Sequence, residues 1–181
     1  MKIIHLTGAQ CSGKTHVVKQ FLGNPNVSYW DILKFYETSG ALSGNQMNWK
    51  IWDKIKDRVV PALNSWLIDN KDKHLCILES SSNARITTRI QELVAEGQSV
   101  TSIQLKTPGK STLIARAKIR NISISQVLSF ADVFDKRHSH PDVFQYTQAA
   151  ASAIITAELK TKELKCLVCF LRSHAKQPFE L

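Results

Sequence analysis

The stretch GAQCSGKTH, from Gly8 to His16, follows a short apolar run and precedes a segment that favours a helix. Its first part matches the pattern G-x-x-x-x-G-K-[ST], in which glycines let backbone N–H groups curl around an anion and the helix N-terminus adds partial positive charge. The lysine of this pattern reaches the β- and γ-phosphates of a nucleotide, and the threonine hydroxyl binds Mg²⁺. The residues that we expect to bind the phosphates of ATP are Gly8, Ala9, Gln10, Cys11, Ser12, Gly13, Lys14 and Thr15.

Short apolar runs alternate with helical patterns along the chain. Strands are predicted at Lys2–Thr7, Val27–Trp30, His74–Glu79, Ser99–Lys106 and Leu164–Leu171. Helices are predicted at Lys14–Leu22, Ile32–Thr38, about Gln46–Ile68 with a kink at Pro61, Ile86–Glu96, Thr112–Asn121, Ser125–Phe134 and Phe144–Leu159. This alternation predicts an α/β fold of the P-loop NTPase type, with a parallel five-stranded sheet and helices on both faces. The ligands of such a sheet bind beyond the carboxyl ends of its strands.

The composition is that of one globular domain. Because 43% of the 181 residues are hydrophobic, the chain can fill one core, and we expect a single domain over residues 1–181. The apolar runs are far shorter than the roughly 20 residues of a membrane-spanning helix, so we expect a soluble, cytoplasmic protein. The formal charge of +9 attracts phosphate-bearing partners, either nucleotides or a nucleic-acid backbone. Many soluble proteins are equally basic, so the charge alone leaves the partner open.

A nucleotide site at this motif serves either a hydrolase or a transferase. A GTPase needs the guanine-reading pattern N-K-x-D after a strand, but the nearest string, DNKDK at Asp69–Lys73, has the wrong spacing and precedes a predicted strand. The motif and the layout of the chain resemble the P-loop kinase superfamily, in particular the kinase domain of phage-type polynucleotide 5′-hydroxyl kinases. The resemblance implies a nucleotide-kinase-like fold with a small helical lid at about residues 108–124, and ATP and Mg²⁺ as ligands.

The segment NPNVSYWDILKFY places Asp31 directly after the second predicted strand. In the polynucleotide kinases that it resembles, an aspartate at this place deprotonates the acceptor hydroxyl, and a basic residue, usually arginine, follows it. Here Lys34 stands at that place, and a lysine cannot form the two-pronged contact with phosphate that arginine forms. A carboxylate beside the phosphate loop also suits a general base without this resemblance. The alternative is that Asp31 only caps the helix that follows.

Polar residues also follow the third predicted strand, in the segment CILESSSN. We expect Glu79 to act on Mg²⁺ through water, since P-loop enzymes usually carry a carboxylate there, and a solvated glutamate is the alternative. Ser80 and Asn83 are expected to line an acceptor pocket or, alternatively, to cap the next helix. The further residues expected to bind the acceptor are Trp30, by stacking on a base, Lys34 and Arg85. For Trp30, a place in the core is the alternative.

The segment TPGKSTLIARAKIRN follows the fourth predicted strand and carries the spacing L-x-x-R-x-x-x-R. Arg116 and Arg120 therefore lie one turn apart on one helical face, which resembles the lid of polynucleotide and nucleotide kinases. Arginines so placed close over the triphosphate and neutralise the charge of the transferring group. An ordinary basic amphipathic helix is the alternative. With this lid, the expected catalytic residues are Asp31, Lys14, Arg116 and Arg120.

These patterns predict a phosphotransferase with an alcohol group as acceptor. The expected reaction is transfer of the γ-phosphate of ATP, with Mg²⁺, to a hydroxyl of a nucleic acid, and a hydroxymethylated base in phage DNA is one such acceptor. The first alternative is a kinase of a free nucleotide, a nucleoside or another small metabolite. The second alternative is a nucleotide-binding regulatory ATPase without an acceptor.

Overall fold

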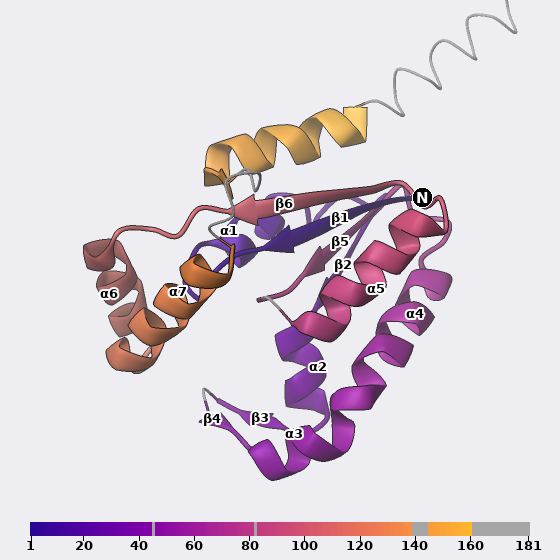
Figure 1. Cartoon of the computed structure of the whole chain (residues 1–181). Helices are drawn as coiled ribbons and strands as arrows, with labels where there is room; N and C mark the ends of the chain where they lie inside the picture. Colours follow the sequence, from indigo (N-terminus) through magenta and orange to yellow (C-terminus); the bar gives the residue numbers. More distant parts are fainter. Residues whose placement is uncertain (45, 82, 139–144, 161–181) are drawn as a thin grey trace, which may run out of the picture.

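A five-stranded sheet forms the centre of the computed structural model, which describes residues 1–44, 46–81, 83–138 and 145–160 (Figure 1). Neighbouring strands in this sheet run parallel. The strands in spatial order are β2 (Val27–Asp31), β5 (Leu75–Glu79), β1 (Lys2–Thr7), β6 (Val100–Leu105) and β7 (Gln145–Tyr146). The predicted α/β fold with a parallel five-stranded sheet is therefore confirmed.

Helices connect these strands and cover the sheet. A two-stranded hairpin, β3 (Leu42–Ser43) with β4 (Gln46–Met47), lies between the second and third helices. Residues 148–160 form a further helix after β7. The other helices are α1 (Lys14–Lys19), α2 (Ile32–Thr38), α3 (Trp49–Ile55), the 3₁₀ turn η1 (Lys56–Arg58), α4 (Val59–Asp69), α5 (Ala84–Ala95), α6 (Lys110–Ile119) and α7 (Ile124–His138).

Successive side chains of a strand point to opposite faces of the sheet. Because the central strands are continuous apolar runs, both faces of the sheet are apolar. On one face, residues such as Ile3 and Leu78 pack against α2, α3, α4 and α5. On the other face, Ile4, Leu6 and Ile77 pack against α1 and the helix of residues 148–160. Since helices cover both faces, a ligand has access to the sheet at the ends of its strands.

The helices α6 and α7 pack against each other and against the loop that follows β1. Their side chains Leu113, Ala117 and Val127 belong to a buried cluster that includes Ala9 and Cys11 of this loop. Figure 1 shows the helix pair beside the carboxyl ends of the strands. Residues 108–124, where a helical lid is predicted, form α6 and the segment that leads into α7, and their role as a lid stays a prediction.

The region between α2 and β5 differs from its prediction. The helix predicted from about Gln46 to Ile68 is wrong at its start, where Gln46–Met47 pairs with β3 and Asn48 caps α3 through its side-chain oxygen. The helical segment breaks at η1 and not at Pro61, which lies in the first turn of α4. A proline fits that place, because the first N–H groups of a helix have no partner inside the helix.

The last part of the described chain also differs from its prediction. The helix predicted at Phe144–Leu159 is wrong at its start, because Gln145–Tyr146 pairs with β6 as the fifth strand and the helix covers residues 148–160. The predicted strand Leu164–Leu171 lies outside the described residues. None of the described helices is long and apolar enough to cross a membrane.

Candidate active site

The loop between β1 and α1 turns through left-handed backbone conformations. Gly13, the N-cap of α1, has a φ of 102°, and Cys11 has a φ of 63°. A glycine takes such angles without the clash that a β-carbon brings. Lys14 is buried and donates hydrogen bonds to the carbonyl oxygens of Gly8 and Ala9, at 2.9 and 3.0 Å. The loop therefore wraps around its own lysine.

Side chains from two distant elements also hold this loop. Arg116 on α6 donates from Nη1 to the carbonyl oxygen of Cys11 at 2.8 Å. Gln148, the first residue of the helix over residues 148–160, donates from Nε2 to the carbonyl oxygen of Ser12 at 2.7 Å. The helix α6 and the last described helix thus contact the phosphate loop directly, and the role of Arg116 at a triphosphate stays a prediction.

The loop also carries polar groups that suit a bound anion. The side-chain oxygens of Ser12 and Gln10 are buried and have no hydrogen-bond partner among the described residues. Burial lowers the pKa of Lys14, and the negative charges of Glu79 and Asp31 act against this shift. A bound phosphate gives the Ser12 hydroxyl an acceptor and gives Lys14 an opposite charge. The loop therefore fits the triphosphate of ATP.

Glu79 ends β5 and is only 4% exposed. Its carboxylate accepts hydrogen bonds from the Tyr29 hydroxyl at 2.6 Å and from the Thr15 hydroxyl at 3.1 Å. Burial raises the pKa of Glu79, and the positive charge of Lys14 acts against this shift. Proteins hold Mg²⁺ with one or two carboxylates together with substrate phosphates. Thr15 and Glu79, in contact beside the phosphate loop, fit such a site.

Asp31 ends β2 in register with Glu79 on β5. Its Oδ1 accepts a hydrogen bond from the backbone N–H of Leu33 at 2.8 Å, so Asp31 caps α2. Asp31 also lines the cavity described below. A carboxylate has two oxygens with several acceptor positions, so the cap is compatible with contact to an acceptor hydroxyl.

These residues line one cavity of about 610 Å³. The phosphate loop, the ends of β2 and β5, and α6 form its walls. Ser81 and the first residues of α2, Ile32 and Leu33, extend the wall beyond Asp31. The cavity therefore joins the phosphate loop to the expected general base. The predicted site residues that line it are Gln10, Cys11, Gly13, Lys14, Thr15, Asp31, Glu79, Ser80, Arg116 and Arg120.

Trp30 and Asn83, both predicted to bind the acceptor, do not line this cavity. Trp30 packs against the core and lies near Phe35, with 6.4 Å between ring centroids. Asn83 caps α5, since its Oδ1 accepts from a backbone N–H, and its Nδ2 donates to the Tyr36 hydroxyl at 2.8 Å. These contacts agree with the structural alternatives for both residues.

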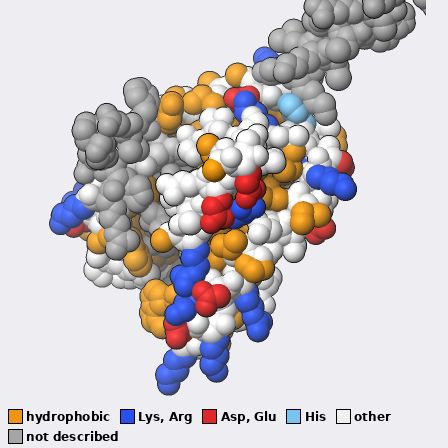
Figure 2. Space-filling model, turned by 45° about the vertical axis from the view of Figure 1, so that its right-hand side comes forward, with side chains coloured by type: hydrophobic (Ala, Val, Ile, Leu, Met, Phe, Trp, Pro, Cys, Tyr) orange, Lys and Arg blue, Asp and Glu red, His pale blue; other side chains and the backbone are white. Residues whose placement is uncertain are grey.

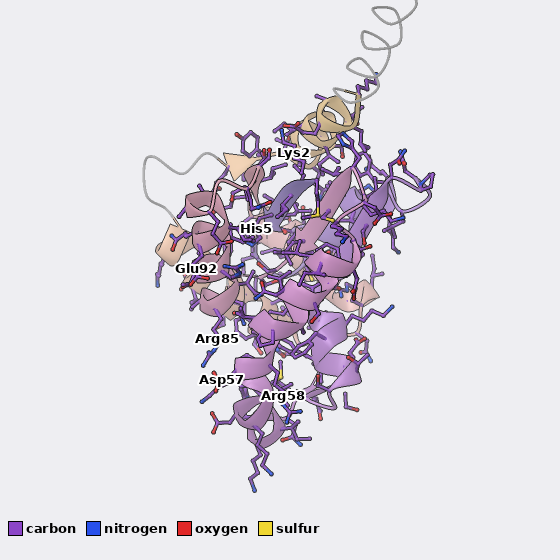
Figure 3. The ribbon with its side chains drawn as sticks, turned by 90° about the vertical axis from the view of Figure 1, so that its right-hand side faces the viewer. Lys2, His5, Asp57, Arg58, Arg85 and Glu92 are labelled. Atoms are coloured by element: carbon purple, nitrogen blue, oxygen red, sulfur yellow. The ribbon has the colours of Figure 1, made fainter. Side chains whose placement is uncertain are left out.

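Arg85 and Lys34 also do not line the cavity. Arg85 on α5 forms an ion pair with Asp57 at 3.0 Å, and Figure 3 shows the two side chains together, away from His5 in the sheet. Lys34 is exposed on α2. An exposed ion pair fixes Arg85 to the α3–α4 region, so the described geometry does not support a role in acceptor binding for this residue.

Three further residues of the site had no signal in the sequence that pointed to them. Gln148 contacts the phosphate loop across 136 positions of the chain. Tyr29 is one of several aromatic residues near Asp31, and the sequence does not show that its hydroxyl contacts Glu79. His5 bonds through Nε2 to the Ser80 hydroxyl at 2.9 Å, and burial lowers the pKa of His5 to about 4. All three contacts join separate elements, which periodicity along the sequence does not reveal.

No protein-family model and no curated protein matches the chain. A solved tunicamycin resistance protein from Deinococcus radiodurans is similar, with a TM-score of 0.56 and 16% identity, over 88% of this chain and 96% of that chain. Shikimate kinase from Bacteroides thetaiotaomicron is similar, with a TM-score of 0.52 and 13% identity, over 88% and 98%. Shikimate kinase from Aquifex aeolicus is similar, with a TM-score of 0.50 and 15% identity, over 90% and 98%. At these identities the likeness concerns the fold, and the chain has the fold of P-loop kinases.

Proposed function

We propose that this protein is a kinase that transfers the γ-phosphate of ATP to a hydroxyl group of a nucleic acid. The observation that carries this proposal is the shared cavity, which Lys14 and Thr15 of the phosphate loop line together with Asp31. A carboxylate beside a phosphate site can take the proton of an acceptor hydroxyl. A protein that only binds nucleotides does not need such a base.

Each wall of the cavity has a role in this proposal. Bound Mg²⁺–ATP supplies the phosphoryl group and the metal charge that neutralises it. The loop Gly8–Thr15 holds the phosphates and, with Glu79, the metal. Asp31 takes the proton of the acceptor hydroxyl, whose oxygen bonds to the γ-phosphorus as the bond to the leaving ADP breaks. Arg116 and Arg120 neutralise the negative charge of the transferring group.

The basic surface of the chain supports a nucleic acid as the acceptor. Lys50 and Lys54 are exposed one turn apart on α3, and Trp49 beside them is 64% exposed. Figure 2 shows Lys and Arg side chains that project from this end of the molecule. Basic side chains bind a phosphate backbone, and an exposed ring stacks on bases. Along the chain, only the β3–β4 hairpin and its flanking residues lie between α2 and α3. The helix α2 begins at the cavity wall beside Asp31.

A small hydroxyl compound, such as a free nucleotide or another metabolite, is the second candidate acceptor. The cavity volume of about 610 Å³ favours it, because sites for small molecules commonly have this size. Two of the similar structures are shikimate kinases, whose name specifies a small-molecule acceptor. In a regulatory ATPase, the remaining alternative, Asp31 would serve only as the cap of α2.

The test is incubation of the protein with ATP labelled at the γ-phosphate and a panel of DNA, RNA, mononucleotides and nucleosides. We expect label on DNA or RNA, with an affinity for the acceptor that falls steeply as salt rises. Label on small acceptors alone, with a flat response to salt, would favour the second candidate. Slow hydrolysis of ATP without label on any member of this panel would overturn the proposals of a nucleic-acid kinase and of a nucleotide or nucleoside kinase together.

A further inference from the structure

The burial of Glu79 is the starting point for a role of Tyr29. A carboxylate that is 4% exposed needs hydrogen-bond donors, because an unpaired buried charge is strongly unfavourable. The Tyr29 hydroxyl donates to Oε2 at 2.6 Å. The Thr15 hydroxyl lies 3.1 Å from Oε1 and 3.3 Å from Oε2. The shortest of these contacts is therefore the one with Tyr29.

Tyr29 is itself held firmly in β2. Tyr29 pairs with Ile77 of β5 in the parallel register. Glu79 lies two residues after Ile77, so the side chains of Tyr29 and Glu79 stand on the same face of the sheet. The ring packs against the apolar cluster beneath α1 and the helix of residues 148–160. From there the hydroxyl reaches the carboxylate two register positions further along, so the core fixes the position of the donor.

Tyr29 and Thr15 can both donate to Glu79 when the metal is bound. The hydroxyl of Thr15, the expected Mg²⁺ ligand, binds a metal through an oxygen lone pair and keeps its proton for the carboxylate, so its position moves with the metal, whereas the core fixes that of Tyr29. Groups that bond to metal-binding carboxylates orient them, and the loss of such a group typically weakens metal affinity by 10–100-fold.

We propose that Tyr29 is a positioning residue for Mg²⁺, which holds the Glu79 carboxylate through Oε2 so that Oε1 stays directed toward the metal side at Thr15. The inference rests on the proposed function only in taking Mg²⁺ with ATP as the ligand. It requires neither phosphoryl transfer nor a particular acceptor. Tyr29 acts through Glu79 and has no assigned contact with the reacting atoms.

The test measures the binding of Mn²⁺, as a spectroscopic substitute for Mg²⁺, to the protein with a non-hydrolysable ATP analogue. We expect Tyr29→Phe to weaken Mn²⁺ binding by about 10-fold or more, because it removes the hydroxyl and keeps the ring. Binding of the analogue in the presence of a chelator stays unchanged. Tyr36→Phe is the matched control, since it removes the hydroxyl of a buried tyrosine that bonds to Asn83 outside the cavity lining.

A double-mutant cycle separates positioning from general damage to the fold. If Tyr29 acts through Glu79, Tyr29→Phe causes no further loss of Mn²⁺ affinity in a Glu79→Gln background. Wild-type Mn²⁺ affinity of Tyr29→Phe, or equal losses in both backgrounds, would overturn the inference. Absence of label on any acceptor in the transfer assay would refute the proposed function and leave this result unaffected.

Discussion

The two sides of the cavity are built in different ways. On the nucleotide side, the continuous loop Gly8–Thr15 offers backbone carbonyls that bind Lys14, Arg116 and Gln148. On the side where we propose that the acceptor binds, the wall consists of side chains from the ends of β2 and β5 and from α2. A site made mainly from one backbone segment is encoded in a short motif, whereas a site made from scattered side chains depends on the whole fold. The comparison explains why one short motif identifies the phosphate loop, whereas Trp30, Asn83 and Arg85, which the sequence assigned to acceptor binding, do not line the cavity.

The largest expected effect comes from Asp31, where the two sides meet. Asp31→Asn should lower the turnover number for phosphoryl transfer by about 10³-fold, because the amide cannot accept the acceptor proton. Asparagine is also a favoured N-cap, so α2 and the thermal stability should remain. Nucleotide binding, measured by calorimetry, should be unchanged. Near-normal transfer by this variant would leave Asp31 with its capping role alone.

The second effect concerns His5, which lies in β1 and contacts Ser80 of the cavity wall. Burial lowers the pKa of His5 from 6.5 to about 4, so the unfolded chain binds more protons between these values. The stabilisation is complete above about pH 6.5 and is lost as pH falls toward 4, which amounts to roughly 3 kcal/mol. Urea unfolding at several pH values measures this slope. His5→Gln should show a flatter profile, and an equal slope in both proteins would contradict the assignment.

A smaller effect is expected at Gln148, which supports the nucleotide side from a distance. Gln148→Ala removes the hydrogen bond to the carbonyl oxygen of Ser12, and one such bond contributes about 1 kcal/mol. We expect ATP affinity to fall by about 5- to 10-fold, with the affinity for the acceptor unchanged. Titration of each ligand separately measures the two quantities. An equal loss for both ligands would mean that the two sides of the cavity are not independent.

The smallest effect is expected at Arg85 on the outer surface. Its ion pair with Asp57 is exposed, and such pairs contribute about 0–1 kcal/mol. Arg85→Ala should therefore change the free energy of unfolding by less than about 1 kcal/mol and the KM for the acceptor by less than about 2-fold. A large rise in that KM would restore Arg85 to the acceptor site, as the sequence predicted, and would require the ion pair to open.

The sequence predicted the strands around the phosphate loop well because β1 and β5 are short apolar runs that are largely buried, and β2 and β6 are short runs of the same kind with partial burial. The same reasoning failed at Gln46–Met47, where a polar and an apolar residue fit a strand as well as a helix start, and a β-strand pairing with Leu42–Ser43 decides the matter. It failed again at Gln145–Tyr146, whose pairing with β6 brings together segments that are distant in the chain. Local propensity is weak evidence where such tertiary contacts act.

The candidate site divides along the same line. Lys14, Thr15, Asp31 and Glu79 were predictable because each directly follows a strand or the glycine motif, and the carboxyl ends of parallel strands meet. Gln148 was not predictable, because its role depends on the place where a helix begins after β7. The role of a side chain whose position depends on packing between distant elements therefore becomes visible only in the structure.

The left-handed backbone at Gly13 limits how this chain can change over evolutionary time. A β-carbon at this position would lie 1.9 Å from Nε2 of Gln148, and the φ of 102° adds a penalty of roughly 1–2 kcal/mol for other residues. Any replacement thus disturbs the junction between the loop and a helix far along the chain. A descendant that no longer used nucleotides would still lose stability if this glycine were replaced. Lys14 would also keep its two hydrogen bonds to the loop carbonyls, so neither residue alone would show that nucleotide binding survives.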